Sequence, residues 1–304
     1  MQFRLADRLH KTVDEIAEMS FAEMQALMRQ VMSGELTHAQ MAAILVALRI
    51  KGESVDEIAA AASVMRELST KVATLASPHL IDTCGTGGDG IQTFNVSTVS
   101  ALVAAAAGAK VAKHGGRSVS SSCGSADVLE ALGVNVNLTP AQVASAVEEI
   151  GIGFMFAPNH HSAMKHAAPV RRELGVRTLF NLLGPLTNPA NAKRQIMGVF
   201  SPALTVKLAQ VMQQLGSEHV LVVCGADGMD EISFTGDSHI AELKNGQVTE
   251  CTINPNQFGM TTHQLASIQI DNAEQSKAMI LAVLNGELGA ARDIVLLNAG
   301  AAIY

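Results

Sequence analysis

The stretch Gly85-Thr86-Gly87-Gly88-Asp89-Gly90 has the residue types of a phosphate-binding loop. Its glycines fit the pattern G-x-G-x-x-G, and it follows the apolar run 79–84, which indicates a short strand. Glycine-rich turns of this kind let backbone N–H groups crowd around phosphate oxygens. The first question is whether the loop binds a dinucleotide or another anion.

Two further requirements of a dinucleotide site are missing from the sequence. A helix should begin inside the glycine motif, so that its N-terminus meets the pyrophosphate, but the next helix is predicted to begin near Ser97. An acidic residue should follow about 20 residues later to bind the ribose, but no Asp or Glu occurs between Gly90 and Ala126. The GK[ST] ending of a Walker loop is absent too.

Two later segments carry anion-binding chemistry of the same kind. Asn95 to Thr98 is predicted at a helix N-terminus, where hydroxyl and free N–H groups favour anions. Lys113 to Ser121 follows a predicted strand and combines cationic side chains, two glycines and hydroxyls, and Ser125 starts the next helix. We therefore expect one phosphate site, in which Asp89 is tolerated if it accepts hydrogen bonds from ligand hydroxyls or loop N–H groups.

An acidic pair, Asp230 and Glu231, follows the apolar run 219–224 and the loop 225–229. Such a pair is more often a solvated surface, but its position at a strand end favours a magnesium site, since Mg²⁺ prefers a few carboxylates and keeps its waters. The histidines at 160, 161 and 166 lack zinc spacing, so we expect them to be structural or to line a substrate site.

Three arginines lie within seven residues near apolar residues and the Gly184-Pro185 loop: Arg171, Arg172 and Arg177. Each alone is compatible with a surface charge. Together they are also suited to hold a carboxylate by bidentate contact. The segment 169–186 is therefore a candidate site for a second substrate.

Composition limits the class of protein. Nearly half of the 304 residues are apolar and 16% are charged, which is typical of a compact globular protein. The net charge of −7, the absence of tryptophan and the single tyrosine argue against nucleic-acid binding. The first ten residues do not resemble a signal peptide, and the apolar stretch 101–109 is too short for a bilayer. Four scattered cysteines indicate reduced thiols, so we expect a cytoplasmic protein.

The elements fall into two groups. Residues 1 to about 70 read as helices, with capping boxes at Ser20, Thr37 and Ser54. Beyond Ser77-Pro78 strands and helices alternate, which predicts an α/β fold with a mostly parallel sheet and flanking helices. The predicted strands are 80–84, 110–113, 154–157, 195–200 and 219–224. The predicted helices are 97–108, 125–132, 140–150, 203–215 and 274–285.

Over nearly its whole length the sequence resembles the anthranilate phosphoribosyltransferase family of tryptophan biosynthesis. The motifs that carry the resemblance are D-T-C-G-T-G-G-D (82–89), N-V-S-T (95–98), K-H-G-x-R-S-V-S-S (113–121), G-S-A-D-V-L-E-A-L-G (124–133), F-A-P (156–158), the run 169–190 and G-M-D-E (228–231). The resemblance implies a small helical domain, residues 1–70 with a returning segment at about 165–190, beside an α/β domain of residues 71–304. It also implies a homodimer that pairs through the helical domain.

The resemblance further implies a reaction and its residues. The amine of anthranilate would attack C1′ of phosphoribosyl pyrophosphate and expel pyrophosphate, with magnesium, expected as two ions, and without a covalent nucleophile. Magnesium would meet Ser97, Asp230 and Glu231, and anthranilate would meet Gly85, Gly116 and Arg171. The phosphoribosyl pyrophosphate site would comprise Gly85, Gly88, Asp89, Thr93, Asn95, Val96, Ser97, Thr98, Lys113, His114, Gly115, Gly116, Arg117, Ser118, Val119, Ser120, Ser121 and Ser125.

The chain departs from the family pattern at two places. Gly116 stands where the family usually has an asparagine whose amide reaches toward anthranilate, which puts the affinity for anthranilate in question. Members of the family continue with further helix beyond the position of Tyr304. From the resemblance we therefore expect that the sequence is truncated at its C-terminus.

Two alternatives remain open at this stage. A pyrimidine nucleoside phosphorylase would share the architecture, but Arg171 and the N-V-S-T segment speak against it. A non-catalytic relative that binds nucleic acid would be expected to lose the acidic pair and to gain basic surface, and this chain keeps the pair and is acidic.

Overall fold

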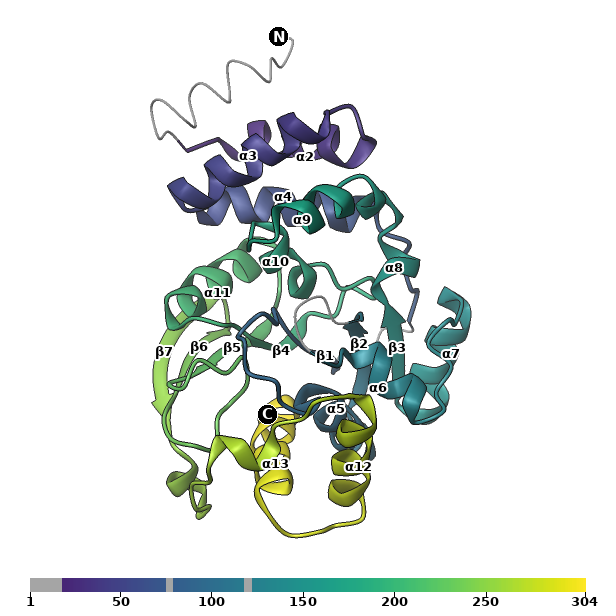
Figure 1. The fold of residues 1–304 in the computed structure, drawn as a ribbon, viewed down its shortest axis with the longest axis vertical. Helices are drawn as coiled ribbons and strands as arrows, with labels where there is room; N and C mark the ends of the chain where they lie inside the picture. The colour runs from purple at the N-terminus through teal and green to yellow at the C-terminus, as the bar shows by residue number, and fades with distance from the viewer. Residues whose placement is uncertain (1–17, 75–78, 118–121) are drawn as a thin grey trace.

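The computed structural model describes residues 18–74, 79–117 and 122–304. A helical unit lies against one side of a larger α/β unit (Figure 1). The first three helices of the described chain are α2 (Phe21–Ser33), α3 (His38–Lys51) and α4 (Val55–Leu68). Each begins at a predicted capping box, in which a hydroxyl and a side chain three residues later exchange bonds with backbone N–H groups: Ser20 with Glu23, Thr37 with Gln40, and Ser54 with Glu57.

The α/β unit is built on a seven-stranded sheet of order β3-β2-β1-β4-β5-β6-β7. The strands are β1 (Leu80–Gly85), β2 (Lys110–Gly115), β3 (Ile152–Phe156), β4 (Arg194–Gly198), β5 (His219–Gly225), β6 (Ser238–Lys244) and β7 (Gln247–Ile253). Strands β1 to β5 are parallel, and β6 and β7 are antiparallel. The predicted class, an α/β fold with a mostly parallel sheet beside a helical domain, is confirmed.

Helices cover both faces of the sheet (Figure 1). They are α5 (Val96–Ala106), α6 (Ser125–Ala131), α7 (Pro140–Ile150), α8 (Ala157–His160), α9 (Ala168–Leu174), α10 (Phe180–Leu183), α11 (Thr205–Gln214), α12 (Ala273–Leu284) and α13 (Ala290–Ile303). Among the described residues, no helix is both long and apolar enough to cross a membrane.

Alternate residues of the central strands supply two separate cores. Met197 and Val222 pack with α2 to α4 and α11, whereas their neighbours Ile196 and Val223 pack with α12 and α13. This division follows from the pleat, because successive side chains of a strand point to opposite faces. The same core that covers the first face contains Val170 of α9, so the chain returns to the helical unit after β3.

The five predicted strands and five predicted helices are present, each within two residues of its predicted ends. The hairpin of β6 and β7 and the helix α13 were not among the predicted elements. The sequence does carry a signal for this hairpin, because the pair Asn245-Gly246 favours a two-residue type I′ turn. In the structure both residues have the positive φ that such a turn requires, 52° and 72°.

Candidate active site

A cleft of about 360 Å³ lies at the carboxyl ends of the parallel strands. It is bordered by the loops that follow β1, β2 and β5, together with α9 and α10. In the sheet β1 lies between β2 and β4, so the order of the strands reverses there. Ligands of open α/β sheets bind at this kind of switch point, where the connections on either side move apart and leave a crevice.

Most of the predicted phosphoribosyl-site residues that the structure describes line this cleft. They are Gly85, Gly88, Asp89, Thr93, Asn95, Val96, Ser97, Lys113, His114, Gly115, Gly116, Arg117 and Ser125. Thr98 does not line it: the residue is 1% exposed within the first turn of α5, and its hydroxyl has no partner. Ser118, Val119, Ser120 and Ser121 lie outside the described residues.

The glycine loop is shaped around the acidic loop that follows β5. The N–H of Gly87 donates to Oδ2 of Asp230 over 2.7 Å. Gly85 has no room for a side chain, because a Cβ there would lie 2.3 Å from the same oxygen. Asp89, the acid within the loop, accepts the N–H of Ile91 over 3.1 Å, which is one of the arrangements that the sequence required of it.

The three predicted magnesium ligands meet at one wall of the cleft. The N–H of Ser97, in the first turn of α5, donates to Oε1 of Glu231 over 3.0 Å. Burial and the charge of Asp89 raise the pKa of Asp230 to about 7. Burial and the charge of Asp230 also raise the pKa of Glu231. Carboxylates held together in this way fit a divalent cation, which would stabilise their charged forms.

The described residues contain no group of three or more His, Cys, Asp or Glu side chains arranged as a metal site. Asp230, Glu231 and Ser97 all line the cleft, and two of the three carry carboxylates. Mg²⁺ is usually bound in this manner, by one or two carboxylates together with waters and substrate phosphates.

Lys113 is nearly buried where it lines the cleft, and its ammonium group bonds to the protein. Its Nζ donates to the carbonyl oxygen of Thr83 and to Oγ of Ser97, the latter over 3.2 Å. The residue is 3% exposed, and burial lowers its pKa, while the nearby carboxylate of Asp82 favours the charged form. Lys113 therefore ties β1 to the start of α5, and it also lines the cleft as the predicted phosphate site requires.

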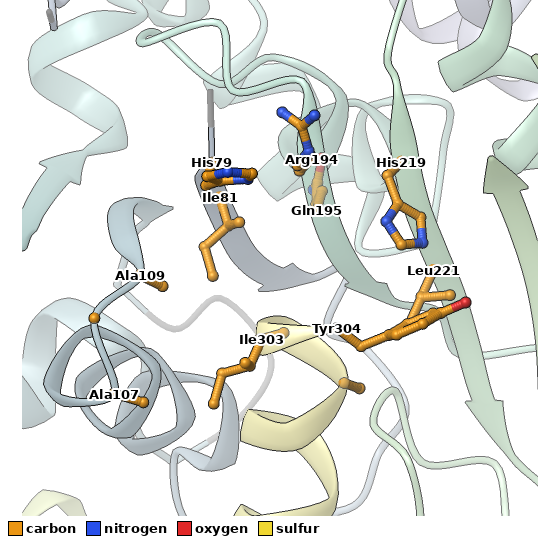
Figure 2. Close-up of a pocket in the computed structure, with 13 residues that line it drawn as sticks. His79, Ile81, Ala107, Ala109, Arg194, Gln195, His219, Leu221, Ile303 and Tyr304 are labelled. Atoms are coloured by element: carbon orange, nitrogen blue, oxygen red, sulfur yellow. The ribbon is translucent and has the colours of Figure 1, made fainter. Parts of the chain in front are cut away.

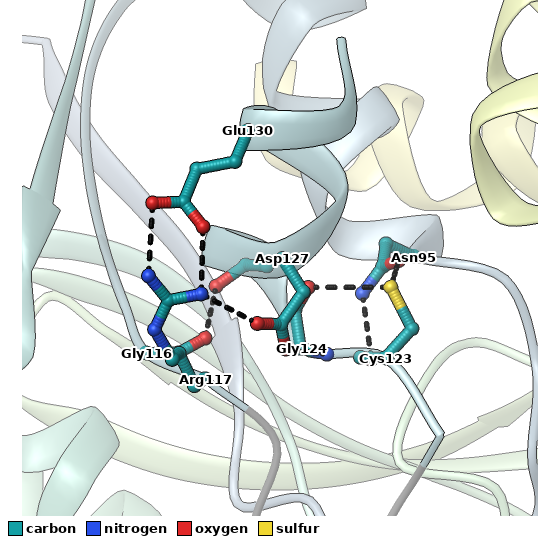
Figure 3. Close-up of polar contacts among 8 residues, drawn as sticks. Asn95, Gly116, Arg117, Cys123, Gly124, Asp127 and Glu130 are labelled. Carbon is teal, nitrogen blue, oxygen red and sulfur yellow. Dashed lines mark hydrogen bonds and ion pairs between the residues drawn. The ribbon is translucent and has the colours of Figure 1, made fainter. Parts of the chain in front are cut away.

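Arg117 is also engaged by the protein (Figure 3). Its guanidinium forms ion pairs with Asp127 over 2.9 Å and with Glu130 over 2.6 Å, both on α6. The side chain is half exposed and lies 5.5 Å from the ring centre of Phe156. Its charge is therefore compensated within the structure.

Arg171 is the arginine that faces the cleft. It lines the cleft, its guanidinium lies 5.4 Å from the ring centre of Phe180, and burial lowers its pKa. No carboxylate pairs with it among the described residues. Arg172 is exposed, and Arg177 donates to the carbonyl oxygen of Gly88. Of the three predicted arginines, Arg171 is the one that lines the cleft.

The sequence analysis did not identify Asp82, whose hydrogen bonds connect β1 with the neighbouring strand β2 and with Asn188. The side chain of Asp82 is fully buried in β1 and accepts bonds from Nδ2 of Asn188 at 2.7 Å and from the N–H of His114 at 3.1 Å. An acidic residue inside an apolar strand was the available signal. The neighbouring His160 and His161 are buried, as expected for structural or substrate-lining histidines, and burial lowers the pKa of His161 to about 4.

A second cavity, of about 300 Å³, lies at the amino ends of the parallel strands, on the side of the sheet away from the cleft (Figure 2). Arg194, His219 and Tyr304 line it at the amino ends of β4 and β5 and at the end of α13. His219 bonds to Glu242 over 2.8 Å, and Arg194 pairs with Glu218 over 2.9 Å. None of the predicted site residues in the described chain lines this cavity.

Two family models match the chain. Residues 6–69 match the helical bundle domain of a glycosyl transferase family, and residues 77–304 match the α/β domain of a glycosyl transferase family. Among curated proteins, the anthranilate phosphoribosyltransferase of Methylobacillus flagellatus is 63% identical over 296 residues, covering 97% of this chain and 86% of its own length. That of Chromobacterium violaceum is 63% identical over 287 residues, covering 94% and 84%.

Solved structures give the same result. The anthranilate phosphoribosyltransferase of Thermus thermophilus superposes with a TM-score of 0.91 at 43% identity, covering 98% of this chain and 88% of its own. The anthranilate phosphoribosyltransferase of Saccharomyces cerevisiae, in complex with PRPP and Mg, superposes with a TM-score of 0.89 at 27% identity, covering 98% and 87%.

Proposed function

The chain belongs to the anthranilate phosphoribosyltransferase family, and we propose that its cleft transfers the phosphoribosyl group of phosphoribosyl pyrophosphate to the amine of anthranilate. The products are N-(5-phosphoribosyl)anthranilate and pyrophosphate. One observation carries this proposal: the glycine loop, the N-terminus of α5, the acidic pair and the unpaired Arg171 border a single cleft.

We assign the phosphates of the first substrate to the glycine loop, the start of α5 and the segment 113–121, together with Ser125. Loop N–H groups and the positive end of a helix dipole are suited to anionic oxygens. Arg171 is proposed to bind the carboxylate of anthranilate, with Gly85 and Gly116 beside its aromatic ring. A half-buried guanidinium without a carboxylate partner favours this assignment, because a carboxylate would compensate its charge.

In the proposed reaction the amine nitrogen forms a bond to C1′ while the bond from C1′ to the pyrophosphate oxygen breaks. The bonding pair leaves with pyrophosphate, and the nitrogen then releases a proton. No residue has to become covalently attached, so the protein contributes by orienting the two substrates and by stabilising charge with fixed dipoles.

Asp230, Glu231 and the hydroxyl of Ser97 would hold magnesium, and we propose two ions. When bound, Mg²⁺ would neutralise negative charge on the departing pyrophosphate. The two carboxylates at the cleft and the raised pKa of Asp230 support this assignment. The yeast relative whose structure contains PRPP and Mg supports it further.

We propose that the helical domain comprises residues 1–70 with the returning segment 165–190, and that residues 71–304 form the α/β domain. We also propose a cytoplasmic homodimer that pairs through the helical domain.

Product formation tests the proposal directly. Purified protein is mixed with anthranilate, phosphoribosyl pyrophosphate and Mg²⁺, and N-(5-phosphoribosyl)anthranilate is measured by chromatography with and without a chelator. We expect product that disappears with the chelator. Cleavage of uridine by phosphate without this product would instead favour a pyrimidine nucleoside phosphorylase. Nucleic-acid binding without either activity would favour the non-catalytic alternative.

A further inference from the structure

Ser276, on α12, lies 181 residues from Asn95 in sequence and makes two hydrogen bonds to it. Its Oγ accepts the backbone N–H of Asn95 over 3.2 Å and donates to Oδ1 of Asn95 over 2.7 Å. Ser276 is fully buried, so these bonds form away from water. Both the donor and the acceptor of this hydroxyl are thus committed to one residue at the cleft.

Cys123 completes the fixation of the Asn95 amide (Figure 3). Its Sγ donates to Oδ1 of Asn95 over 3.3 Å, and Nδ2 of Asn95 donates to the carbonyl oxygen of Cys123 over 3.2 Å. Two donors at Oδ1 and one acceptor at Nδ2 set the orientation of the amide. Within the part of the chain that the structure describes, the second hydrogen of Nδ2 has no partner, and Asn95 lines the cleft.

Asn95 occupies the N-cap position of α5, but its side chain makes no capping bond. Asparagine is a favoured N-cap residue because its side chain usually accepts an N–H of the first turn. Here the network with Ser276 and Cys123 withholds the side chain from that use. The N–H groups of the first turn of α5 have other partners, among them Glu231 for Ser97 and the carbonyl of Asn95 for Thr98. This arrangement leaves one amide N–H of Asn95 available at the cleft.

The segment before α5 is attached to the chain before α12 by backbone bonds as well. The N–H of Phe94 donates to the carbonyl of Ile268 over 3.0 Å, and the N–H of Ile270 donates to the carbonyl of Gln92 over 2.8 Å. Ser276 therefore acts on a segment whose backbone is already held. Its particular contribution is the orientation of the Asn95 side chain.

We propose that Ser276 is a positioning residue for the reaction, which acts through Asn95 by directing its unused amide N–H toward the oxygens of phosphoribosyl pyrophosphate. The proposal rests on the proposed function, because that function supplies the substrate. A merely structural serine would stabilise the fold without a selective effect on this ligand. The two roles are separated by measuring whether the effects of Ser276 and Asn95 are coupled.

The experiment is a double-mutant cycle of Ser276→Ala, Asn95→Ala and the double variant, with the dissociation constant of phosphoribosyl pyrophosphate measured by calorimetry in the presence of Mg²⁺. We expect Ser276→Ala to raise this constant about five- to tenfold, the magnitude of one neutral hydrogen bond. In the Asn95→Ala background the same change should have no further effect. The KM for anthranilate should change less than about twofold, because the proposed function assigns Asn95 to the phosphate site and not to the anthranilate site.

Ser100→Ala is the matched control, because Ser100 is also buried, on α5, and its hydroxyl has no partner. It should leave the dissociation constant unchanged. Effects of Ser276→Ala and Asn95→Ala that multiply, or a normal affinity in Ser276→Ala, would overturn the proposal. If Ser276→Ala does not fold, Ser276→Cys keeps a weaker hydrogen-bonding group and is tested in the same cycle. A wild-type protein that binds phosphoribosyl pyrophosphate but forms no product would refute the proposed function alone.

Discussion

The N–H of Ser97 donates to Oε1 of Glu231 over 3.0 Å, and this bond connects the N-terminus of α5 with the loop after β5. The positive end of the α5 dipole thereby faces the acidic pair, which favours the carboxylate form of Glu231 against the cost of its burial. This hydrogen bond therefore joins the proposed phosphate site directly to the proposed metal site.

Asp230→Ala and Glu231→Ala should each lower kcat by at least about 100-fold, because a catalytic metal supplies several kcal/mol of charge stabilisation. The affinity for phosphoribosyl pyrophosphate should fall as well, since the metal is proposed to contact that substrate. Glu250→Ala, which changes an exposed acid on β7, is the control and should behave as wild type. Steady-state kinetics at several Mg²⁺ concentrations measures these effects. Normal turnover of either variant in excess chelator would exclude the assignment.

The binding of Mg²⁺ should depend on pH near neutrality. The pKa of Asp230 is raised to about 7 in the folded protein from 3.8 in the free side chain, so between these values the folded chain holds a proton that the unfolded chain releases. The contribution of this group to metal-free stability is therefore greatest below the lower value and is lost as the pH rises toward 7. Because Mg²⁺ needs the carboxylate, its apparent affinity should rise as the pH passes through about 7.

Calorimetric titration with Mg²⁺ on both sides of neutral pH checks this dependence. Asp89→Asn removes the charge that contributes to the raised pKa, so its affinity curve should shift to lower pH. A wild-type affinity that does not vary across this range would contradict the prediction.

Gly85→Ala should lower kcat severely and should lower the thermal stability of the protein much less. Its Cβ would lie 2.3 Å from Oδ2 of Asp230, so the carboxylate has to move. Gly90→Ala is the comparison, because Gly90 has a φ of 78° and no atom within 4 Å of its Cβ position. That change should cost only about 1–2 kcal/mol of backbone strain. Thermal unfolding and kcat of the two variants are compared. Equal activity of both would show that the position of Asp230 is not critical.

Arg171→Ala should weaken anthranilate far more than phosphoribosyl pyrophosphate. Loss of one partner of a desolvated charge pair costs about 2–5 kcal/mol, which appears as a higher KM for anthranilate. Arg172→Ala removes the adjacent, exposed arginine and should leave both KM values unchanged. An equal rise in both KM values for Arg171→Ala would mean that Arg171 orders the whole site and does not bind the carboxylate.

Gly116→Asn should lower the KM for anthranilate and leave that for phosphoribosyl pyrophosphate nearly unchanged. The φ of Gly116 is not in the left-handed region, and a Cβ would lie 3.9 Å from that of Ala157, so the backbone and the space around Cβ accept a side chain here. A hydrogen bond that involves a charged group is worth about 1.5–3 kcal/mol, of which the backbone and a water recover a part. Kinetics with each substrate varied in turn decides. An unchanged or higher KM for anthranilate would show that residue 116 does not contact the amine.

Local sequence determined the elements. The hydroxyl of Thr139, followed by Pro140 and Gln142, caps α7 as predicted, because capping depends on residues within one turn. The strands β1 to β5 were recognisable for a similar reason. Each is a short apolar run whose residues are mostly buried, and this pattern can be read within the strand itself. The hairpin of β6 and β7 carries a local signal at Asn245-Gly246, but β7 is mostly exposed and has little of the apolar pattern that identifies a strand.

The sequence also showed which residue types are present at the site, but it did not show which partners their side chains bond to. Lys113 and Arg117 both belong to a segment with phosphate-binding chemistry, yet the first bonds to Thr83 and Ser97 and the second pairs with acids of α6. A charged side chain turns toward whichever partner lowers its electrostatic free energy, and these partners lie 10 to 30 residues away, beyond the reach of local patterns. The contact of Gly87 with Asp230, 143 residues apart, likewise exists only because parallel strands bring their carboxyl ends to one edge. The sequence by itself therefore determined which groups are present, whereas the order of the strands decided which of them meet.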